Sequence, residues 1–165
     1  NPPDKMFLAD VNGDGRTDLI ARGVLPANEG WIYTSLGNSN GSFGPTNGPW
    51  GIWNNSSHTQ IISPTSALYF ADLNGDGRAD YISIGLSFIE IRYGNSSGFF
   101  TYSSTTRGTI NCTMQDKILF GKFTPYNRQD ILCIKSGTKS VSVGATWAGS
   151  YYNWVWYSGQ GYLIN

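Results

Sequence analysis

Short runs of hydrophobic residues recur along the whole chain, and segments rich in Gly, Asn, Asp and Ser separate them. Runs of this kind, rich in aromatic and β-branched residues and bounded by turn formers, are typical of β-strands. Hydrophobic residues do not recur at helical spacing over any long stretch, and no apolar run approaches the roughly 18 residues of a transmembrane helix. The pattern therefore predicts an all-β protein without a membrane span.

One segment of this pattern occurs three times. Residues 7–20 read FLADVNGDGRTDLI, and residues 69–82 read YFADLNGDGRADYI, which is nearly the same sequence. Residues 119–132 read LFGKFTPYNRQDIL, which keeps the apolar ends of the segment and loses most of its acidic centre. Internal repetition of this kind is the sequence signature of a repeat architecture.

A second element follows each copy of this segment. It consists of an apolar run rich in aromatic residues, a turn of Gly, Asn and Ser, and another aromatic residue, at 31–43, 88–100 and 154–163. This order is typical of a β-hairpin. Each repeat therefore supplies about four strands: one before the acidic loop, one after it, and two around the glycine turn.

Four-stranded repeats of roughly 40–60 residues are typical of the blades of a β-propeller. We predict a single domain over residues 1–165 made of four-stranded antiparallel blades at about 5–66, 67–114 and 115–165. Three blades do not close a ring, because propellers typically have about 4–8 of them. The ring is then completed by a remainder missing from this chain or, as we favour, by a homo-oligomer, for example two chains that form six blades.

Composition supports a turn-rich β-protein and excludes some partners. The 165 residues include 11 Lys and Arg and 11 Asp and Glu, so the formal net charge is zero. Without a basic excess the chain is not expected to bind nucleic acid. Two cysteines, Cys112 and Cys133, lie in strand-like runs, and neighbouring antiparallel strands would bring them within bonding distance. A disulfide fits a secreted protein, and two buried free thiols are the alternative.

The acidic centres of the first two copies have the order of oxygen donors that suits calcium. Ca²⁺ takes about 6–8 oxygen ligands, and glycines between the donors let the backbone turn tightly around the ion. The predicted ligands of the first loop are the side chains of Asp10, Asn12, Asp14 and Asp18 with the carbonyl of Arg16. Those of the second loop are the side chains of Asp72, Asn74, Asp76 and Asp80 with the carbonyl of Arg78. Solvated acidic turns without a metal are the alternative, which the twofold repetition disfavours.

The two acidic loops differ from an EF-hand and from the third copy of the segment. An EF-hand requires helical flanks and a Glu at position 12 of its loop, where this chain has Ala21 and Ser83. In the third copy, Lys122 and Tyr126 replace the first and second carboxylates, and only the third, Asp130, remains. We therefore predict two calcium sites and none in the third loop, where the Lys122 ammonium would pair with Asp130.

The motif resembles the FG-GAP/VCBS repeat family, in which an aromatic residue precedes Asp-x-Asn-Gly-Asp-Gly-x-x-Asp and an apolar strand follows. The resemblance implies a β-propeller in which calcium stiffens blade loops and takes no part in catalysis. Members of the family include the integrin α-chain head, fungal lectins of the Psathyrella velutina type, and propeller modules of toxins and secreted enzymes. The aromatic, glycine-rich texture of this chain is most similar to the lectins.

Catalysis is not predicted. Six of the 11 acidic residues belong to the two loops, which leaves few carboxylates to form the pair that glycoside hydrolysis needs. The single histidine, His58, cannot form a zinc site alone, and no nucleophile motif is present.

Glycan binding is the function that we predict. Sugars are recognised by aromatic faces together with planar polar groups. Trp50, Trp53 and Trp147 lie in loop-like stretches and are the candidate stacking residues, although packing between blades is an equal alternative for them. We predict a secreted, calcium-stabilised lectin that is multivalent through its repeated blades. The alternative is a propeller module that binds proteins, or the propeller part of a larger secreted protein or toxin.

Overall fold

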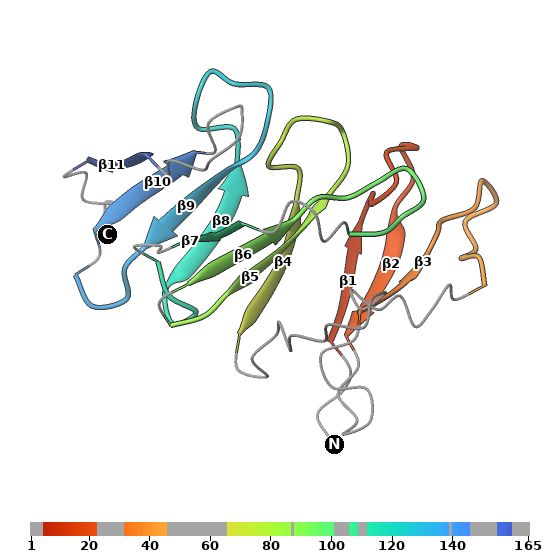
Figure 1. Cartoon of the computed structure of the whole chain (residues 1–165), viewed down its shortest axis with the longest axis horizontal. Helices are drawn as coiled ribbons and strands as arrows, with labels where there is room; N and C mark the ends of the chain where they lie inside the picture. Colours follow the sequence, from red (N-terminus) through yellow and green to blue (C-terminus); the bar gives the residue numbers. More distant parts are fainter. Residues whose placement is uncertain are drawn as a thin grey trace.

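The computed structural model describes residues 5–22, 32–45, 66–86, 88–100, 106–108, 112–138, 140–145 and 155–159. These residues form three antiparallel β-sheets that follow one another along the chain and lie side by side (Figure 1). No helix long and apolar enough to cross a membrane occurs in this part of the chain. The predicted all-β fold class is therefore confirmed.

Each sheet is built from strands that are consecutive in sequence. The first sheet has the order β1 (Lys5–Ala9), β2 (Asp18–Arg22) and β3 (Ile32–Ser35). The second has the order β4 (Ala67–Ala71), β5 (Asp80–Ile84), β6 (Ile89–Arg92) and β7 (Thr106–Gly108). The third pairs β8 (Lys117–Gly121), β9 (Asp130–Ile134), β10 (Val141–Ala145) and β11 (Val155–Gly159). The second and third sheets thus have the predicted four strands, and the described residues give the first sheet three.

The strand assignment in the third repeat differs from our expectation. Sequence similarity equated the aromatic run beginning at Trp154 with the runs at 31–36 and 88–93, which form the third strand of their sheets. The third strand is instead β10, and residues 155–159 form the fourth strand, β11. A tight turn, in which the Lys135 N–H donates to the Ser140 carbonyl at 2.9 Å, brings β10 back beside β9. The sequence of β10, VSVGA, has none of the aromatic residues on which the prediction relied.

The two cores lie between adjacent sheets. Val11, Ile20, Ile32, Tyr81 and Phe100 are among the buried residues between the first and second sheets. The core between the second and third sheets has Leu73, four isoleucines of β5 and β6, and the two cysteines among its buried members. Rings contact each other across both boundaries, since the ring centroids of Phe7 and Phe70 are 5.0 Å apart and those of Tyr69 and Phe120 are 5.3 Å apart.

The predicted disulfide is present, between Cys112 and Cys133, and both residues are fully buried. Cys133 lies in β9, as expected, but Cys112 lies in the irregular segment before β8 and not in a strand. The bond therefore ties the chain entering the third sheet to the middle of that sheet, instead of joining two neighbouring strands.

Candidate functional site

The three loops that contain the repeated motif lie at the same edge of the stack (Figure 1). They connect the first two strands of each sheet: β1 to β2, β4 to β5, and β8 to β9. This placement follows from the repeat, because each sheet begins with the same strand, loop and strand.

In the first loop the backbone wraps around the carboxylate of Asp10. Its Oδ1 accepts hydrogen bonds from the N–H groups of Gly13 at 2.7 Å and Asp14 at 3.2 Å, and its Oδ2 accepts one from Gly15 at 2.7 Å. Gly13 and Gly15 have φ angles of 79° and 81°, in the left-handed region that favours glycine. The glycines of the motif therefore let three N–H groups converge on one carboxylate.

Asp18, at the end of the motif, connects the loop to the turn after β3. Its side chain is fully buried, and it accepts hydrogen bonds from the N–H groups of Val11 at 2.9 Å and Gly37 at 2.8 Å. Gly37 is bridged to Phe43 across that turn. A Cβ atom at Gly37 would lie 2.4 Å from the carbonyl oxygen of Thr17, so the close approach requires glycine.

The middle of the first loop is more exposed. Asn12 donates its side-chain amide to Asp14 at 2.8 Å, and Asp14 also forms an ion pair with Arg16. The hydrogen bond from Asn12, the N–H of Arg16 and the charge of Arg16 lower the pKa of Asp14. Arg16 donates its Nε–H to the Gly37 carbonyl at 2.7 Å, which fixes the guanidinium between the loop and the turn.

The second loop repeats this arrangement bond for bond. Asp72 accepts from the N–H groups of its own loop, with contacts of 2.6, 3.2 and 2.9 Å, and Asp80 accepts from Leu73 at 2.8 Å and Gly94 at 3.1 Å. Asp76 pairs with Arg78 as Asp14 pairs with Arg16. Two stretches of sequence 62 residues apart therefore adopt the same local structure.

Burial and like charge act together on Asp80. Burial of its carboxyl group raises the pKa of Asp80 to about 7, although two backbone N–H groups oppose the shift. The negative charges of Asp76 and Asp72 add to the increase. This loop therefore concentrates negative charge around a buried carboxyl group, an environment that a cation would stabilise.

The third loop keeps the shape of the motif with different contacts. Asp130 accepts from the N–H groups of Phe123 at 2.9 Å and Thr124 at 2.8 Å. The predicted pairing of Lys122 with Asp130 is wrong, because the Lys122 ammonium donates to the Asn127 side chain at 2.8 Å. With its two oxygens directed at the Thr124 hydroxyl and at backbone N–H groups, Asp130 is already satisfied.

An aromatic contact replaces the ion pair of the first two loops in the third. The Arg128 guanidinium lies 4.6 Å from the centre of the Tyr126 ring, and these residues occupy the positions of Arg16 and Asp14. A cation over an aromatic face is stabilised by the charge distribution of the ring. The arginine of the third loop thus has an aromatic ring as its partner, where the arginines of the first two loops have a carboxylate that could also bind a metal.

The donor set of the first two loops suits calcium in kind and in order, since carboxylate and amide oxygens alternate along a tight turn. The carboxylates do not converge on one point in this conformation, because Asp14 and Asp76 turn towards arginines. Among the described residues, the one group of three metal-ligating side chains with ligand atoms within 4.8 Å of one another is Cys112, Asp116 and Cys133. Its two cysteines are joined in the disulfide and offer no thiolate.

Backbone hydrogen bonds join each loop to the next. The N–H of Ala79 in the second loop donates to the Asp10 carbonyl at 2.7 Å, and the N–H of Gln129 in the third donates to the Asp72 carbonyl at 2.8 Å. The side chain of Gln129 also accepts the N–H of Asp72 at 3.0 Å. The residue that begins one acidic motif is therefore bonded directly to the neighbouring loop, so the conformation of each loop affects the boundary between two sheets.

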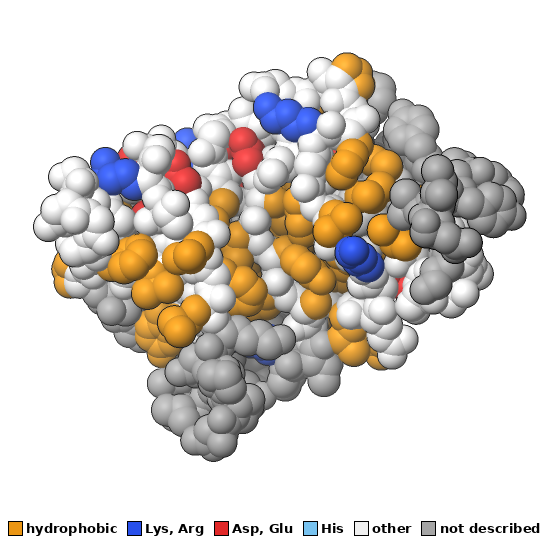
Figure 2. Space-filling model, turned by 180° about the vertical axis from the view of Figure 1, so that it is seen from behind, with side chains coloured by type: hydrophobic (Ala, Val, Ile, Leu, Met, Phe, Trp, Pro, Cys, Tyr) orange, Lys and Arg blue, Asp and Glu red, His pale blue; other side chains and the backbone are white. Residues whose placement is uncertain are grey.

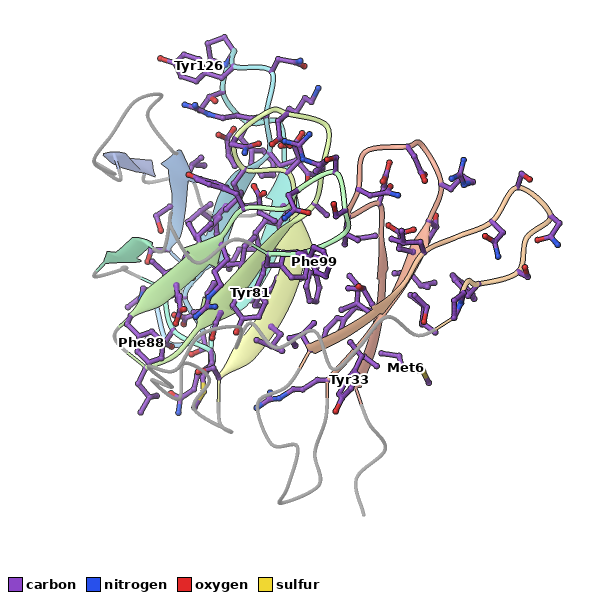
Figure 3. The ribbon with its side chains drawn as sticks, turned by 45° about the vertical axis from the view of Figure 1, so that its right-hand side comes forward. Met6, Tyr33, Tyr81, Phe88, Phe99 and Tyr126 are labelled. Carbon is purple, nitrogen blue, oxygen red and sulfur yellow. A yellow bond between two sulfur atoms is a disulfide. The ribbon has the colours of Figure 1, made fainter. Side chains whose placement is uncertain are left out.

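A buried charged pair was not identified from the sequence. Glu90 and Arg92, in β6, are fully buried and hydrogen-bonded at 2.9 Å. The strand register places Glu90 opposite Ser83 and Arg92 opposite Tyr81 on the side of the second sheet that faces the first, where Figure 3 shows Tyr81. Burial raises the pKa of Tyr81. The sequence feature that could have revealed this pair is the alternation of charged residues with isoleucine in the run FIEIRY.

The candidate sugar-stacking residues Trp50, Trp53 and Trp147 lie outside the described residues. The same holds for His58. The predicted metal ligands of the first two loops are all described, and each set lies within one motif without its carboxylates converging on one point.

Consecutive antiparallel sheets that each begin with the same strand, loop and strand, and whose loops are hydrogen-bonded to one another, define a protein built of propeller-type blades. Residues 10–83 match the family model of the FG-GAP-like repeat, which confirms the resemblance over the first two loops. No curated protein sequence matches the chain.

Among solved structures the chain is similar to a lectin of Agrocybe aegerita, with a TM-score of 0.66 and 20% sequence identity. The match covers 94% of this chain and 37% of the lectin chain, so this chain spans little more than a third of that lectin's length. The lectin structure is described as the basis of specific recognition of non-reducing terminal N-acetylglucosamine. At this level of identity the similarity shows the shared fold alone.

Proposed function

We propose that the chain is a carbohydrate-binding protein whose fold is stabilised by calcium. The observation that carries the carbohydrate part is the similarity of nearly the whole chain to a lectin that recognises terminal N-acetylglucosamine. The FG-GAP-like match is compatible with this function, and it gives no support to a catalytic role. Terminal N-acetylglucosamine is therefore the first ligand to test.

We assign calcium a structural role at the edge of the stack. The side chains of Asp10, Asn12, Asp14 and Asp18 with the Arg16 carbonyl would hold one ion, and their counterparts Asp72, Asn74, Asp76, Asp80 and the Arg78 carbonyl would hold the other. Bound calcium neutralises the clustered carboxylates and rigidifies the loops. Because the Asp10 and Asp72 carbonyls accept hydrogen bonds from the next loop, a rigid loop also stabilises the boundary between sheets.

Secretion is part of the same proposal. The disulfide between Cys112 and Cys133 is of the kind that persists in oxidising compartments, and extracellular fluid supplies calcium at concentrations that weak loops require. Several binding sites on repeated blades would make the protein multivalent, so that its avidity for a glycan-coated surface exceeds the affinity of one site.

The test is binding to a glycan array, followed by calorimetric titration with N-acetylglucosamine and its oligomers. We expect binding to glycans with a terminal N-acetylglucosamine, and at least a tenfold loss in one or more of the variants Trp50→Ala, Trp53→Ala and Trp147→Ala. The matched control is Phe123→Ala, which removes an aromatic side chain that is 48% exposed on the third loop.

The result also separates the two parts of the proposal. Chelation that lowers the melting temperature and leaves sugar binding intact in the folded protein would support a purely structural calcium. A folded, calcium-loaded protein that binds no glycan would contradict the lectin function and favour a module that binds another protein.

A further inference from the structure

Among the described residues, the middle sheet has a neighbouring sheet on both faces, whereas each end sheet has one on a single face. All five residues of β5 are buried. In β2 buried and half-buried residues alternate, as they do from Ile131 to Ile134 in β9. Since successive side chains of a strand point to opposite faces, each end sheet has one face that no other described sheet covers.

The uncovered face of the first sheet, which we call the β1–β3 outer face, comprises Met6, Leu8, Leu19, Ala21 and Tyr33. The strand register places Met6, Ala21 and Tyr33 in one row and Leu8 beside Leu19. Figure 3 shows Met6 and Tyr33 near one another in this sheet. Figure 2 shows hydrophobic side chains gathered at the surface on the side of the stack where the first sheet lies.

The residues of this face match positions that are buried in the middle sheet. Met6 is 67% exposed and its counterpart Leu68 is 5% exposed. Phe43, after the turn that follows β3, is 44% exposed, and its counterpart Phe100 is 8% exposed. Leu68 and Phe100 are buried because the first sheet covers them. The β1–β3 outer face therefore has the composition of a face that packs against another sheet.

The opposite end of the stack has a matching face. The β8–β10 outer face comprises Leu119, Leu132 and Val143 in one row, and Ile134 and Val141 together with the exposed Lys117 in the next. In the second sheet, isoleucines occupy the positions of the four apolar residues that β9 and β10 contribute to this face. These isoleucines are fully buried, and the third sheet covers them: Ile82, Ile84, Ile89 and Ile91.

The two outer faces are complementary, because both existing boundaries pair the same positions. Phe7 contacts Phe70 at the first boundary, and Tyr69 contacts Phe120 at the second. The counterpart of Phe7 and Tyr69 in the third sheet is Leu119, which is 40% exposed. The counterpart of Phe70 and Phe120 in the first sheet is Leu8, which is 66% exposed.

The backbone shows the same complementarity. At both boundaries the eighth residue of one loop donates its N–H to the carbonyl of the first residue of the preceding loop, from Ala79 to Asp10 and from Gln129 to Asp72. Within the described residues, the corresponding N–H of Thr17 and the corresponding carbonyl of Lys122 form no such bond. One end of the stack thus offers a donor and the other an acceptor at the same edge.

We propose that the β8–β10 outer face of one molecule packs on the β1–β3 outer face of a second copy of this chain. Leu119 would contact Leu8 of the second copy, and the N–H of Thr17 would donate to the Lys122 carbonyl across the boundary. The contact joins two different faces, and two copies related by a twofold axis make it twice, which gives six sheets. Six lies within the usual range of propeller blades, about 4–8. This inference concerns assembly and does not depend on carbohydrate binding.

The test is sedimentation equilibrium of the chain, of the variants Leu8→Asp and Leu119→Asp, and of an equimolar mixture of the two variants. The matched control is Leu86→Asp, since Leu86 is 60% exposed in the turn between β5 and β6 and belongs to neither outer face. Far-ultraviolet circular dichroism verifies that each variant is folded.

We expect the parent and the control to sediment as dimers and each outer-face variant to dissociate at least tenfold more readily. The mixture should regain part of the association, because Leu119 of one variant meets Leu8 of the other at an intact boundary. A parent that sediments as a monomer would overturn the proposal. So would a Leu119→Asp variant that dimerises as well as the parent, since the β1–β3 outer faces would then pair with each other.

Discussion

Calcium stabilisation is tested most directly by removing the carboxylate at the fifth position of both acidic loops. In the variant Asp14→Asn with Asp76→Asn, each asparagine keeps an oxygen that can accept the N–H of Arg16 or Arg78, as the aspartates do at 2.9 Å. The loop backbone should therefore be retained. What each substitution removes is a negative charge and a strong oxygen ligand for the metal.

The expected magnitude depends on whether calcium is present. Without the metal, the variant loses two ion pairs on the surface, at side chains that are 46% and 24% exposed in the first loop and 29% and 26% exposed in the second. Pairs of this kind contribute little to stability. With calcium at 100 times its dissociation constant, each site of the parent adds about 2.7 kcal/mol to the free energy of unfolding, or about 5 kcal/mol for two sites. For a chain of this size that raises the melting temperature by about 10–20 °C.

The assay is thermal unfolding, followed by circular dichroism, of the parent and the variant in calcium, in magnesium and in a calcium chelator. We expect the two proteins to melt within a few degrees of each other in chelator, and the calcium increment to appear in the parent alone. Magnesium should give little of it, because its small octahedral shell does not suit a loop of this type. The control Asp116→Asn, which removes a carboxylate outside both loops, should keep the calcium increment.

A calcium increment of equal size in the parent and the variant would refute the assignment of calcium to these two loops. Such a result would place the ion elsewhere. A parent whose melting temperature is the same in calcium and in chelator would also contradict it, because the two loops would then be stable through their backbone and arginine contacts alone.

Two further predictions concern the third sheet. Replacing Cys112 and Cys133 together by alanine should lower the free energy of unfolding by about 3 kcal/mol in urea denaturation, since the bond closes a loop with a sequence separation of 21; equal stability of the parent and the variant in urea would refute this. Burial disfavours the charge of Asp116, but hydrogen bonds from Ser136, Thr113 and Lys135 outweigh it and lower the pKa of Asp116 to about 2. Because the folded pKa is below the unfolded value of 3.8, its contribution is present above about pH 4 and is lost as the pH falls towards 2. Asp116→Asn should therefore be less stable than the parent by about 1–3 kcal/mol at pH 7, and a difference that stays constant down to pH 2 in urea titrations would contradict this.

The repeated motif allowed much of the fold to be predicted. Strand, acidic loop and strand are specified locally, because the spacing of Asp10, Gly13 and Gly15 makes one tight loop favourable wherever it occurs. Finding it twice indicated repeated sheets, and the alternating strands around it indicated the class of fold. The aromatic signal failed at β10, where five residues without an aromatic side chain form the third strand.

The tertiary structure decided which residues act across the sheets. No local pattern states that the Asp10 carbonyl receives the N–H of Ala79, or that Lys122 turns to Asn127 and leaves Asp130 to backbone donors. The sequence determined the three repeated units and the chemistry of two of their loops, because these depend on neighbours along the chain. The stacking of the sheets decided which apolar faces are buried and which two have no described sheet against them, because burial depends on residues that are distant in sequence and adjacent in space.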